Sequence, residues 1–296
     1  MSTIIANDSD ISGHGDSFIF ITDLHDQDRH YSTALAKYIC DNSNVNRVIY
    51  GGDYINEPTS HAAAVSQLTS RVTNMRLNDR TIFLRGNHDS NPYGTGQVSD
   101  SELHTILCGG LDPDIITDNK LYYYEDNDTE KIRYIYLDTG INGAIDAEQI
   151  SWFTSAINLS SDWTVVIISH IALVDGGYDV RTTNNYYNVV SSLETIINNA
   201  TPTIAAWICG HNHIDMYNTT KFSFPIIVVT CDAHSFQASQ YSSDARAENT
   251  INEQAFNVFH INTSTKTVTI TRIGGGEVNV INSGDLTDND KIYTYT

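Results

Sequence analysis

The sequence is poor in cysteine and in basic residues, and it has no long apolar run. Its four cysteines are scattered without a CxxC pair, which argues against a thiolate zinc site or a disulfide scaffold. No run of about 18 apolar residues occurs, so no transmembrane helix is expected. Residues 1–16 lack the basic start and apolar core of a secretory signal.

The shortage of basic residues gives the chain a strongly negative charge. Lys and Arg number 16 against 36 Asp and Glu, for a formal net charge of −20. Such a surface repels nucleic-acid backbones, which argues against binding of nucleic-acid duplexes. An anionic substrate would need a local cationic centre, and metal ions would supply one.

The remaining pattern indicates one α/β domain. Short apolar runs alternate with helical stretches in the first half, as in βαβ units with parallel strands, and the last third favours antiparallel strands. Helices are predicted at residues 29–41, 58–75 (with Asn56 as N-cap), 147–159 and 188–199, with a loop-rich insert at 90–120. The expected organisation is a flexible lead at 1–16, a domain at 17–276 and a polar tail at 277–296.

Five apolar runs end in polar turns, and this feature organises the chain. The turns are Asp23-x-His25, Gly52-Asp53, Gly86-Asn87-His88-Asp89, Ser169-His170 and Gly210-His211-Asn212-His213. Strands of an open α/β sheet present such turns at one edge, where ligands bind. The five turns are therefore expected to meet.

The side chains of these turns are typical of a two-metal site. Mixed imidazole and carboxylate ligands suit Mn, Fe, Zn or Ni better than Ca or Mg. In Asp23-x-His25 and His211-x-His213, alternate residues point to one side of an extended backbone, so one ion can take both. Asp53 has two oxygens and can bridge two ions, which would clamp the attacking and leaving oxygens of a phosphoryl transfer. Asn87 can coordinate through its carbonyl, which leaves His88 as a proton donor.

Each turn alone also has an ordinary interpretation. Asp-x-His and Gly-Asp are common in surface turns and helix caps, and a lone histidine at a strand end is usually just hydrogen-bonded. The ordered set of five is what favours a metal site. His30, His61 and His104 lie in or beside helical stretches and are expected to be surface or helix-cap residues, and His14 lies in the polar lead. Whether His234 reaches the rim of the site stays open.

The five turns contain the motifs DxH, GD, GNHD, a lone H after a strand, and GHNH. These motifs follow the order found in calcineurin-like metallophosphoesterases, and this chain resembles that family over residues 23–213. The resemblance implies a four-layer α/β/β/α sandwich with mixed sheets and a dinuclear metal centre. It also implies that His88 protonates the leaving oxygen. The implied ligands are Asp23, His25, Asp53 and His213 for the first ion, and Asp53, Asn87, His170 and His211 for the second.

One departure from the family narrows the expected activity. Many protein phosphatases of this group read GDxVDRG, whereas this chain reads Gly52-Asp53-Tyr54-Ile55-Asn56-Glu57. The missing Asp would orient the catalytic histidine, and the missing Arg would bind phosphate. The chain instead resembles phosphodiesterase-type and phage-associated members. That implies a small-molecule or polymer phosphoester as substrate, with phosphodiesters favoured. Because the sequence shows no signal peptide or transmembrane segment, no membrane partner is expected, and a cytoplasmic or virion-associated location is predicted.

The sequence also argues against two other functions. A non-catalytic phosphoesterase fold, kept as a binding or virion structural component, would be expected to lose ligands, but the full set is present. A dinuclear hydrolase of the metallo-β-lactamase type needs an HxHxDH run, which the sequence lacks. Neither the substrate, the native metal pair nor the oligomeric state follows from the sequence.

Overall fold

A computed structural model describes residues 14–25, 31–112, 115, 119–171, 190–213, 215–218, 222–233, 246, 250, 253–275 and 290–296. Five helices occur in this part of the chain: α3 (Tyr31–Asn42), α4 (His61–Met75), α5 (Asp100–Leu107), α6 (Ala147–Ala156) and α7 (Val190–Asn198).

Two six-stranded mixed sheets form the centre of the molecule. The first has the order β12-β11-β10-β1-β2-β3, with strands Asp290–Thr294, Thr267–Gly274, Ala255–Asn262, Gly15–Ile21, Arg47–Tyr50 and Thr81–Phe83. The second has the order β4-β5-β6-β7-β9-β8, with strands Tyr123–Asn127, Ile132–Leu137, Thr164–Ser169, Thr203–Cys209, Ile226–Val228 and Met216–Asn218. Strands β1, β2 and β3 are parallel, as are β5, β6, β7 and β9, whereas β10, β11 and β12 are antiparallel.

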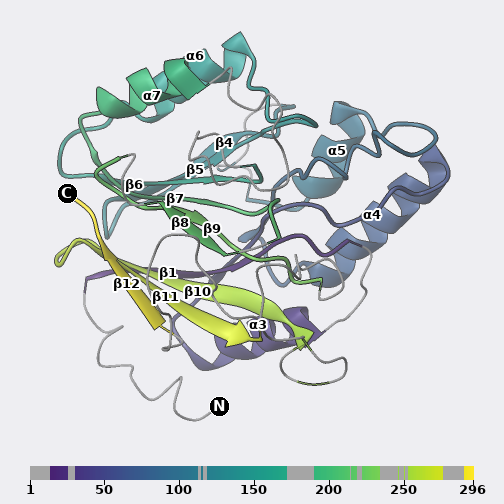
Figure 1. Cartoon of the computed structure of the whole chain (residues 1–296), viewed down its shortest axis with the longest axis horizontal. Coiled ribbons are helices and arrows are strands. Elements are labelled where there is room, and N and C mark those ends of the chain that lie inside the picture. Colours follow the sequence, from purple (N-terminus) through teal and green to yellow (C-terminus); the bar gives the residue numbers. More distant parts are fainter. Residues whose placement is uncertain are drawn as a thin grey trace.

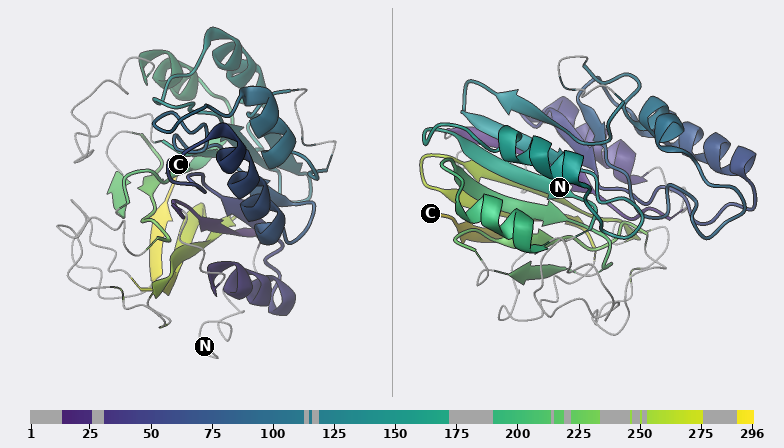
Figure 2. Two further views of the ribbon diagram at one scale, coloured as in Figure 1. Left: turned by 90° about the vertical axis from the view of Figure 1, so that its right-hand side faces the viewer. Right: turned by 90° about the horizontal axis from the view of Figure 1, so that it is seen from above.

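The layers stack as an α/β/β/α sandwich, which confirms the predicted fold class. Helices α6 and α7 cover the outer face of the sheet that contains β5, β6 and β7, and α3 lies outside the other sheet (Figure 1). Helices α4 and α5 lie side by side beyond β3 (Figures 1 and 2). Both sheets therefore bury one face against each other and one against helices, which explains why their parallel strands are almost wholly apolar.

The core lies mainly between the two sheets. Phe18 of β1 is fully buried, stacks on Phe259 of β10 with ring centroids 5.2 Å apart, and meets the edge of Tyr134 on β5 at 5.5 Å. Because Phe18 and Tyr134 belong to different sheets, this contact joins the two sheets. The carboxyl ends of the parallel strands, and therefore the turns that follow these strands, lie next to one another.

Three local predictions need correction. Helix α4 begins at His61 because the Ser60 side chain accepts a hydrogen bond from the backbone N–H of Ala63, so Ser60 rather than Asn56 is the N-cap. The predicted loop-rich insert contains helix α5, whose start is a capping box of Ser99 and Glu102. The predicted polar tail contains β12, which extends the first sheet as its edge strand. That strand is short and its Ile292 is mostly exposed, so it lacks the apolar pattern of a core strand.

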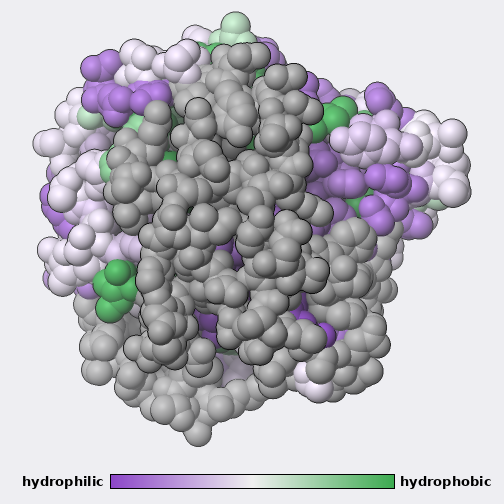
Figure 3. Space-filling view, viewed as in Figure 1, coloured by the Kyte–Doolittle hydropathy of each residue, from purple (hydrophilic) through white to green (hydrophobic). Residues whose placement is uncertain are grey.

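No helix in the described part of the chain is long and apolar enough to cross a membrane. Among the coloured residues of the face in Figure 3, hydrophilic side chains gather over the α4–α5 side, and hydrophobic ones occur as isolated spots.

Candidate metal centre

The structure brings all five polar turns together at one edge of the sandwich. The first sheet contributes the turns after β1, β2 and β3, and the second contributes those after β6 and β7. Buried or nearly buried side chains from these turns form two groups that share Asp53. The first group is Asp23, His25, Asp53 and His213, and the second is Asp53, His170 and His211.

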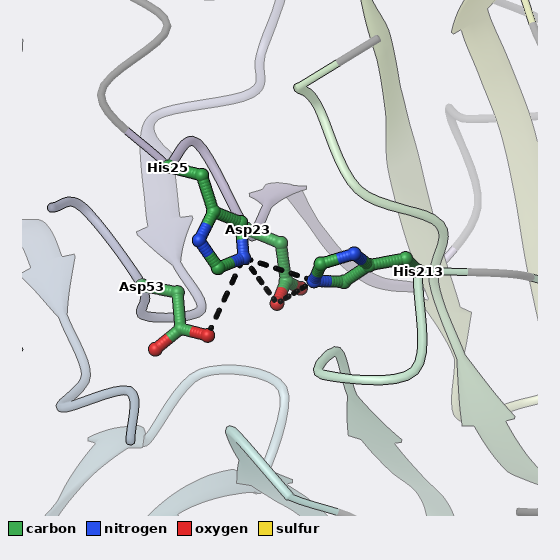
Figure 4. Close-up of side chains that lie close together, drawn as sticks. All are labelled: Asp23, His25, Asp53 and His213. Carbon is green, nitrogen blue, oxygen red and sulfur yellow. Dashed lines mark hydrogen bonds and ion pairs between the residues drawn. The ribbon is translucent and has the colours of Figure 1, made fainter. Parts of the chain in front are cut away.

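The first group is compact and surrounds a small volume (Figure 4). The Nε2 atoms of His25 and His213 lie 2.9 Å apart, and His213 Nε2 lies 3.2 Å from Asp23 Oδ1. His25 Nε2 also lies 3.6 Å from Asp53 Oδ2. Two imidazole nitrogens at this separation, with carboxylates beside them, need a proton or a cation between them.

The second group meets the first at Asp53. His170 Nδ1 lies 2.7 Å from the carbonyl oxygen of Gly51, which accepts its hydrogen bond. This bond turns His170 Nε2 toward the site, 3.3 Å from Asp53 Oδ2 and 3.0 Å from Asn87 Oδ1. The ring of His211 lies next to that of His170, with centroids 5.3 Å apart. The amide oxygen of Asn87 is therefore placed with this group.

The backbone is left-handed where it delivers these side chains, so the prediction of extended Asp-x-His and His-x-His segments is wrong. His211 and His213 belong to different groups and not to one ion. Left-handed φ angles are found at Asp23 (57°), His25 (45°), Asp53 (58°), His211 (71°) and His213 (58°). Residues with side chains avoid this region at a cost of about 1–3 kcal/mol each, and such strain clusters at functional sites. Asp23 and His25 are held by backbone hydrogen bonds from their N–H groups to the carbonyls of Gly52 and Asp53, at 3.0 and 2.9 Å.

The carboxylates of the site are ionised. Burial raises the pKa of Asp23, but the imidazoles of His213, His170 and His25 outweigh it and hold the pKa well below its usual value. Burial likewise raises the pKa of Asp53, and His170 and His25 outweigh it in the same direction. Both groups therefore present negative charge inside the protein.

The imidazoles divide into two kinds. Burial lowers the pKa of His25 and of His211 to about 4, so both rings are neutral near pH 7. Burial also lowers the pKa of His170, but the neighbouring carboxylate of Asp53 outweighs it and raises the pKa to about 10. A proton on His170 thus stabilises Asp53, and a metal ion in this position would displace that proton.

These residues fit a pair of divalent cations. Asp23 Oδ1 is buried and has no hydrogen-bond partner, although it faces the imidazole of His213. The donor atoms of each group lie within 4.8 Å of one another, and they combine neutral imidazole nitrogen with carboxylate oxygen. Nitrogen and oxygen donors of this kind suit first-row transition metals. The cluster is therefore a candidate divalent metal centre.

His88 lies beside the cluster and belongs to neither group. Its backbone N–H donates to Asp53 Oδ1 at 2.8 Å, and its ring centroid is 4.9 Å from that of His25. The side chain keeps 20% of its surface exposed, so its ring is open to a bound molecule. This position is suited to the predicted proton transfer, which stays a prediction.

Asp89 supports the site through the backbone of two turns. Its carboxylate accepts from the N–H of Gly86 at 2.7 Å, within its own turn. It also accepts from the N–H groups of Asp53 and Tyr54, at 2.9 and 2.7 Å. Burial and the charge of Asp53 raise the pKa of Asp89 to about 7. Asp89 therefore ties the GNHD turn to the turn that delivers Asp53.

Glu57 is a residue that the sequence analysis did not place at the site. Its Oε1 lies 3.8 Å from His88 Nδ1, and its φ of 52° is in the same strained region as those of the cluster. The sequence signal was the departure from GDxVDRG, which puts an acid where the family pattern has Arg. That departure brings negative charge to the rim of the site.

His14, His61 and His104 lie outside the cluster. His61 is about half exposed and pairs with Glu102 at 3.0 Å, and His104 is in the last turn of α5. His14 is exposed at the start of the described chain. His30 and His234 lie outside the described residues, so the question of His234 at the rim stays open.

Comparisons with known proteins agree with this geometry. A family model described as calcineurin-like phosphoesterase matches residues 17–215. A solved dimetal phosphatase from Danio rerio has a similar structure, with a TM-score of 0.64 and 15% identity, over 95% of this chain and 99% of that one. A structure of PhoD gives a TM-score of 0.56 and 12% identity, over 87% of this chain and 65% of that one. The comparison with curated protein sequences gives no match.

Proposed function

Because the chain belongs to the calcineurin-like phosphoesterase family, we propose that it is a metal-dependent phosphoesterase that prefers phosphodiesters to phosphoproteins and other monoesters. The buried Asp and His cluster supports the metal dependence. Mn, Fe, Zn and Ni are the candidate ions, and manganese is the first to test. The substrate would be a phosphoester in a small molecule or a polymer.

The preference for diesters is supported above all by Glu57. A monoester carries up to about two negative charges at neutral pH, because its second pKa is about 6, whereas a diester carries one. The Glu57 carboxylate, beside His88, disfavours the additional charge. Arg85, which directly precedes Gly86, is bound to Asp138 and Asp100, so this cation is already neutralised.

The chain's own residues would divide the work as follows. Asp23, His25, Asp53 and His213 would hold one ion, and Asp53, Asn87, His170 and His211 the other. Bound divalent ions would supply Lewis-acid charge for the phosphoryl oxygens and for the attacking water. Asp89 fixes the turn of Asp53, and Asp53 in turn fixes His88 through the backbone N–H of His88. The imidazole of His88 would give its proton to the leaving oxygen as the bond from phosphorus to that oxygen breaks.

The direct test is an ester panel with the metal-loaded protein. Bis(4-nitrophenyl) phosphate, 4-nitrophenyl phosphate and a phosphoserine peptide would be assayed after loading with Mn²⁺, with metal content measured on the same sample. We expect two ions per chain and the highest kcat/KM for the diester. Faster turnover of the phosphopeptide would reverse the proposed preference. Two bound ions without turnover of any ester would favour a non-catalytic binding module.

Resemblance to phage-associated members and a virion location receive no support from the fold or the site. Both stay predictions from the sequence.

A further inference from the structure

An exposed tyrosine stands beside the proposed proton donor. The ring of Tyr93 lies 5.5 Å from the ring of His88, centroid to centroid, at an interplanar angle of 55°. Yet 62% of the surface of Tyr93 is exposed, more than for any other aromatic residue in the described part of the chain. One side of this ring therefore contacts the site, and much of the rest is open.

The loop that carries Tyr93 is firmly anchored. Asn91 is fully buried, and its side-chain Nδ2 donates to the carbonyl oxygens of Pro58 at 3.1 Å and Gly96 at 3.0 Å. Thr95 also donates from its hydroxyl to the carbonyl of Thr59. A Cβ on Gly94 would come within 2.4 Å of the Pro58 carbonyl oxygen, so the loop sits against residues 58–59 with no spare room. The exposure of Tyr93 is therefore not the result of a loosely packed loop.

The same anchored region carries Glu57, so the rim combines a ring and a negative charge. Glu57 and Tyr93 both lie next to His88. The two segments that carry them are joined by the hydrogen bonds described above. A flat aromatic group gains from stacking on tyrosine, and a carboxylate repels anions. The rim therefore favours aromatic groups that carry no negative charge.

We propose that Glu57, His88 and Tyr93 form a leaving-group subsite, which binds phosphoesters whose leaving alcohol carries a flat aromatic ring and no negative charge. This inference rests on the proposed function, because His88 marks the leaving-group side only if it donates the proton. The class includes aryl esters and esters of nucleosides, and it excludes leaving groups that end in a phosphate or a carboxylate.

The test separates stacking from acidity. Phenyl methyl phosphate and hexafluoroisopropyl methyl phosphate have leaving alcohols of similar acidity, but only the phenyl group is flat and aromatic. The ratio of kcat/KM for the phenyl ester to that for the fluoroalkyl ester is expected to fall about twofold to tenfold in Tyr93→Ala, through KM. Tyr93→Phe should keep the ratio, because it keeps the ring. Tyr38→Ala, at another exposed tyrosine that lies on α3, is the matched control and should also keep it.

A second pair of esters tests the charge. The ratio of kcat/KM for 4-carboxyphenyl methyl phosphate to that for phenyl methyl phosphate should be low in the wild type. It should rise about twofold to fivefold in Glu57→Gln, because the repelling charge is gone.

Binding without turnover gives an independent measurement. Phenylphosphonate and methylphosphonate have a carbon–phosphorus bond in place of the ester bond, and their affinities would be measured by titration calorimetry. The affinity ratio should favour phenylphosphonate in the wild type and fall in Tyr93→Ala. Suppose that the wild type hydrolyses phenyl methyl phosphate and hexafluoroisopropyl methyl phosphate, but that neither their kcat/KM ratio nor the phosphonate affinity ratio changes in Tyr93→Ala. The proposed subsite would then be wrong, while the proposed phosphoesterase activity would still hold. If the metal-loaded wild type hydrolyses no ester, the proposed function itself fails.

Discussion

Strand β2 begins in one buried polar cluster and ends in another. Its first residue, Arg47, belongs to an ionic network with Asp16 and Glu125, whereas Asp53, just past its last residue, belongs to the candidate metal centre. Both clusters join the two sheets and both hold two carboxylates. They differ in how the negative charge is balanced, and that difference separates a structural cluster from a functional one.

The network contains its own cation. Arg47 Nη1 binds Asp16 Oδ2 at 2.8 Å, its Nε pairs with Glu125, and its guanidinium stacks over the Tyr134 ring at 4.2 Å. Tyr134 donates to Asp16 at 3.0 Å, and Tyr136 donates to Glu125 at 2.6 Å. One cation and two phenol groups thus face the two acids, although Glu125 Oε2 is buried without a hydrogen-bond partner.

The candidate metal centre balances its charge differently. Its carboxylates face imidazoles rather than an arginine, and five of its residues have left-handed φ angles. In the described part of the chain, the three charged residues of the network show no such strain. The turns of the metal centre therefore lower local stability in order to place their side chains, whereas the network holds its charges without such a cost.

The largest effect is expected at His88. His88→Asn should lower kcat by about 10²–10⁴ for a diester with an alkoxide leaving group, because general-acid help is lost. The loss should shrink for 4-nitrophenyl esters, whose leaving group departs without a proton. Metal content should stay at two ions per chain. Lost metal with a uniform rate loss across leaving groups would instead make His88 a ligand, and unchanged turnover of the alkyl ester would remove it from the mechanism.

Two substitutions, one in each cluster, would test whether the clusters have different roles. Arg47→Met leaves Asp16 and Glu125 buried without a cation, so we expect the free energy of unfolding to fall by about 3–5 kcal/mol. The variant should keep its metal-binding residues in place. Asp53→Asn should instead lower metal affinity about tenfold or more. Urea unfolding in chelator and metal titration at a temperature where both variants fold would measure the two effects. If both variants lost unfolding free energy and metal affinity to the same extent, the two clusters would not have separate structural and metal-binding roles.

The smallest effect is a pH dependence at Asp16. Burial raises the pKa of this carboxyl, but Arg47 outweighs burial and holds the pKa below the ordinary 3.8. A carboxyl with a lowered folded pKa stabilises the protein above its unfolded pKa, and the contribution disappears as the pH falls through the folded value. The difference in unfolding free energy between wild type and Asp16→Asn, about 1–3 kcal/mol, should be constant near neutral pH and shrink below about pH 4. A difference that is independent of pH would show that the Asp16 charge is not involved.

The sequence predicts the site better than the network, for a physical reason. Each site residue sits in a short turn directly after an apolar strand, as with Asp53 after β2, so a local pattern reports it. Asp16 and Tyr134, by contrast, meet across 118 positions of sequence, and nothing local in either marks the contact. Arg47 likewise looks like an ordinary strand-initiating residue until the second sheet covers it.

The missed elements follow the same distinction. Helix α5 has a local signal, because Ser99 and Glu102 show the spacing of a capping box, and the sequence analysis did not use it. Strand β12 has no comparable signal, since its place depends on pairing with β11. The contact of Glu57 with His88 depends on how two turns meet, so the sequence shows the unusual acid but not its neighbour.

The division of the cluster between the sheets has a thermodynamic consequence. Asp23, His25, Asp53 and Asn87 come from one sheet, and His170, His211 and His213 come from the other, so ions held among them would connect both halves of the sandwich. Such ions bind the folded chain and not the open one, which makes folding and metal loading a single linked equilibrium. At a free metal concentration 100 times the dissociation constant, each site would add about 2.7 kcal/mol to the free energy of unfolding. Metal supply would then set the thermodynamic stability of the folded protein as well as its activity.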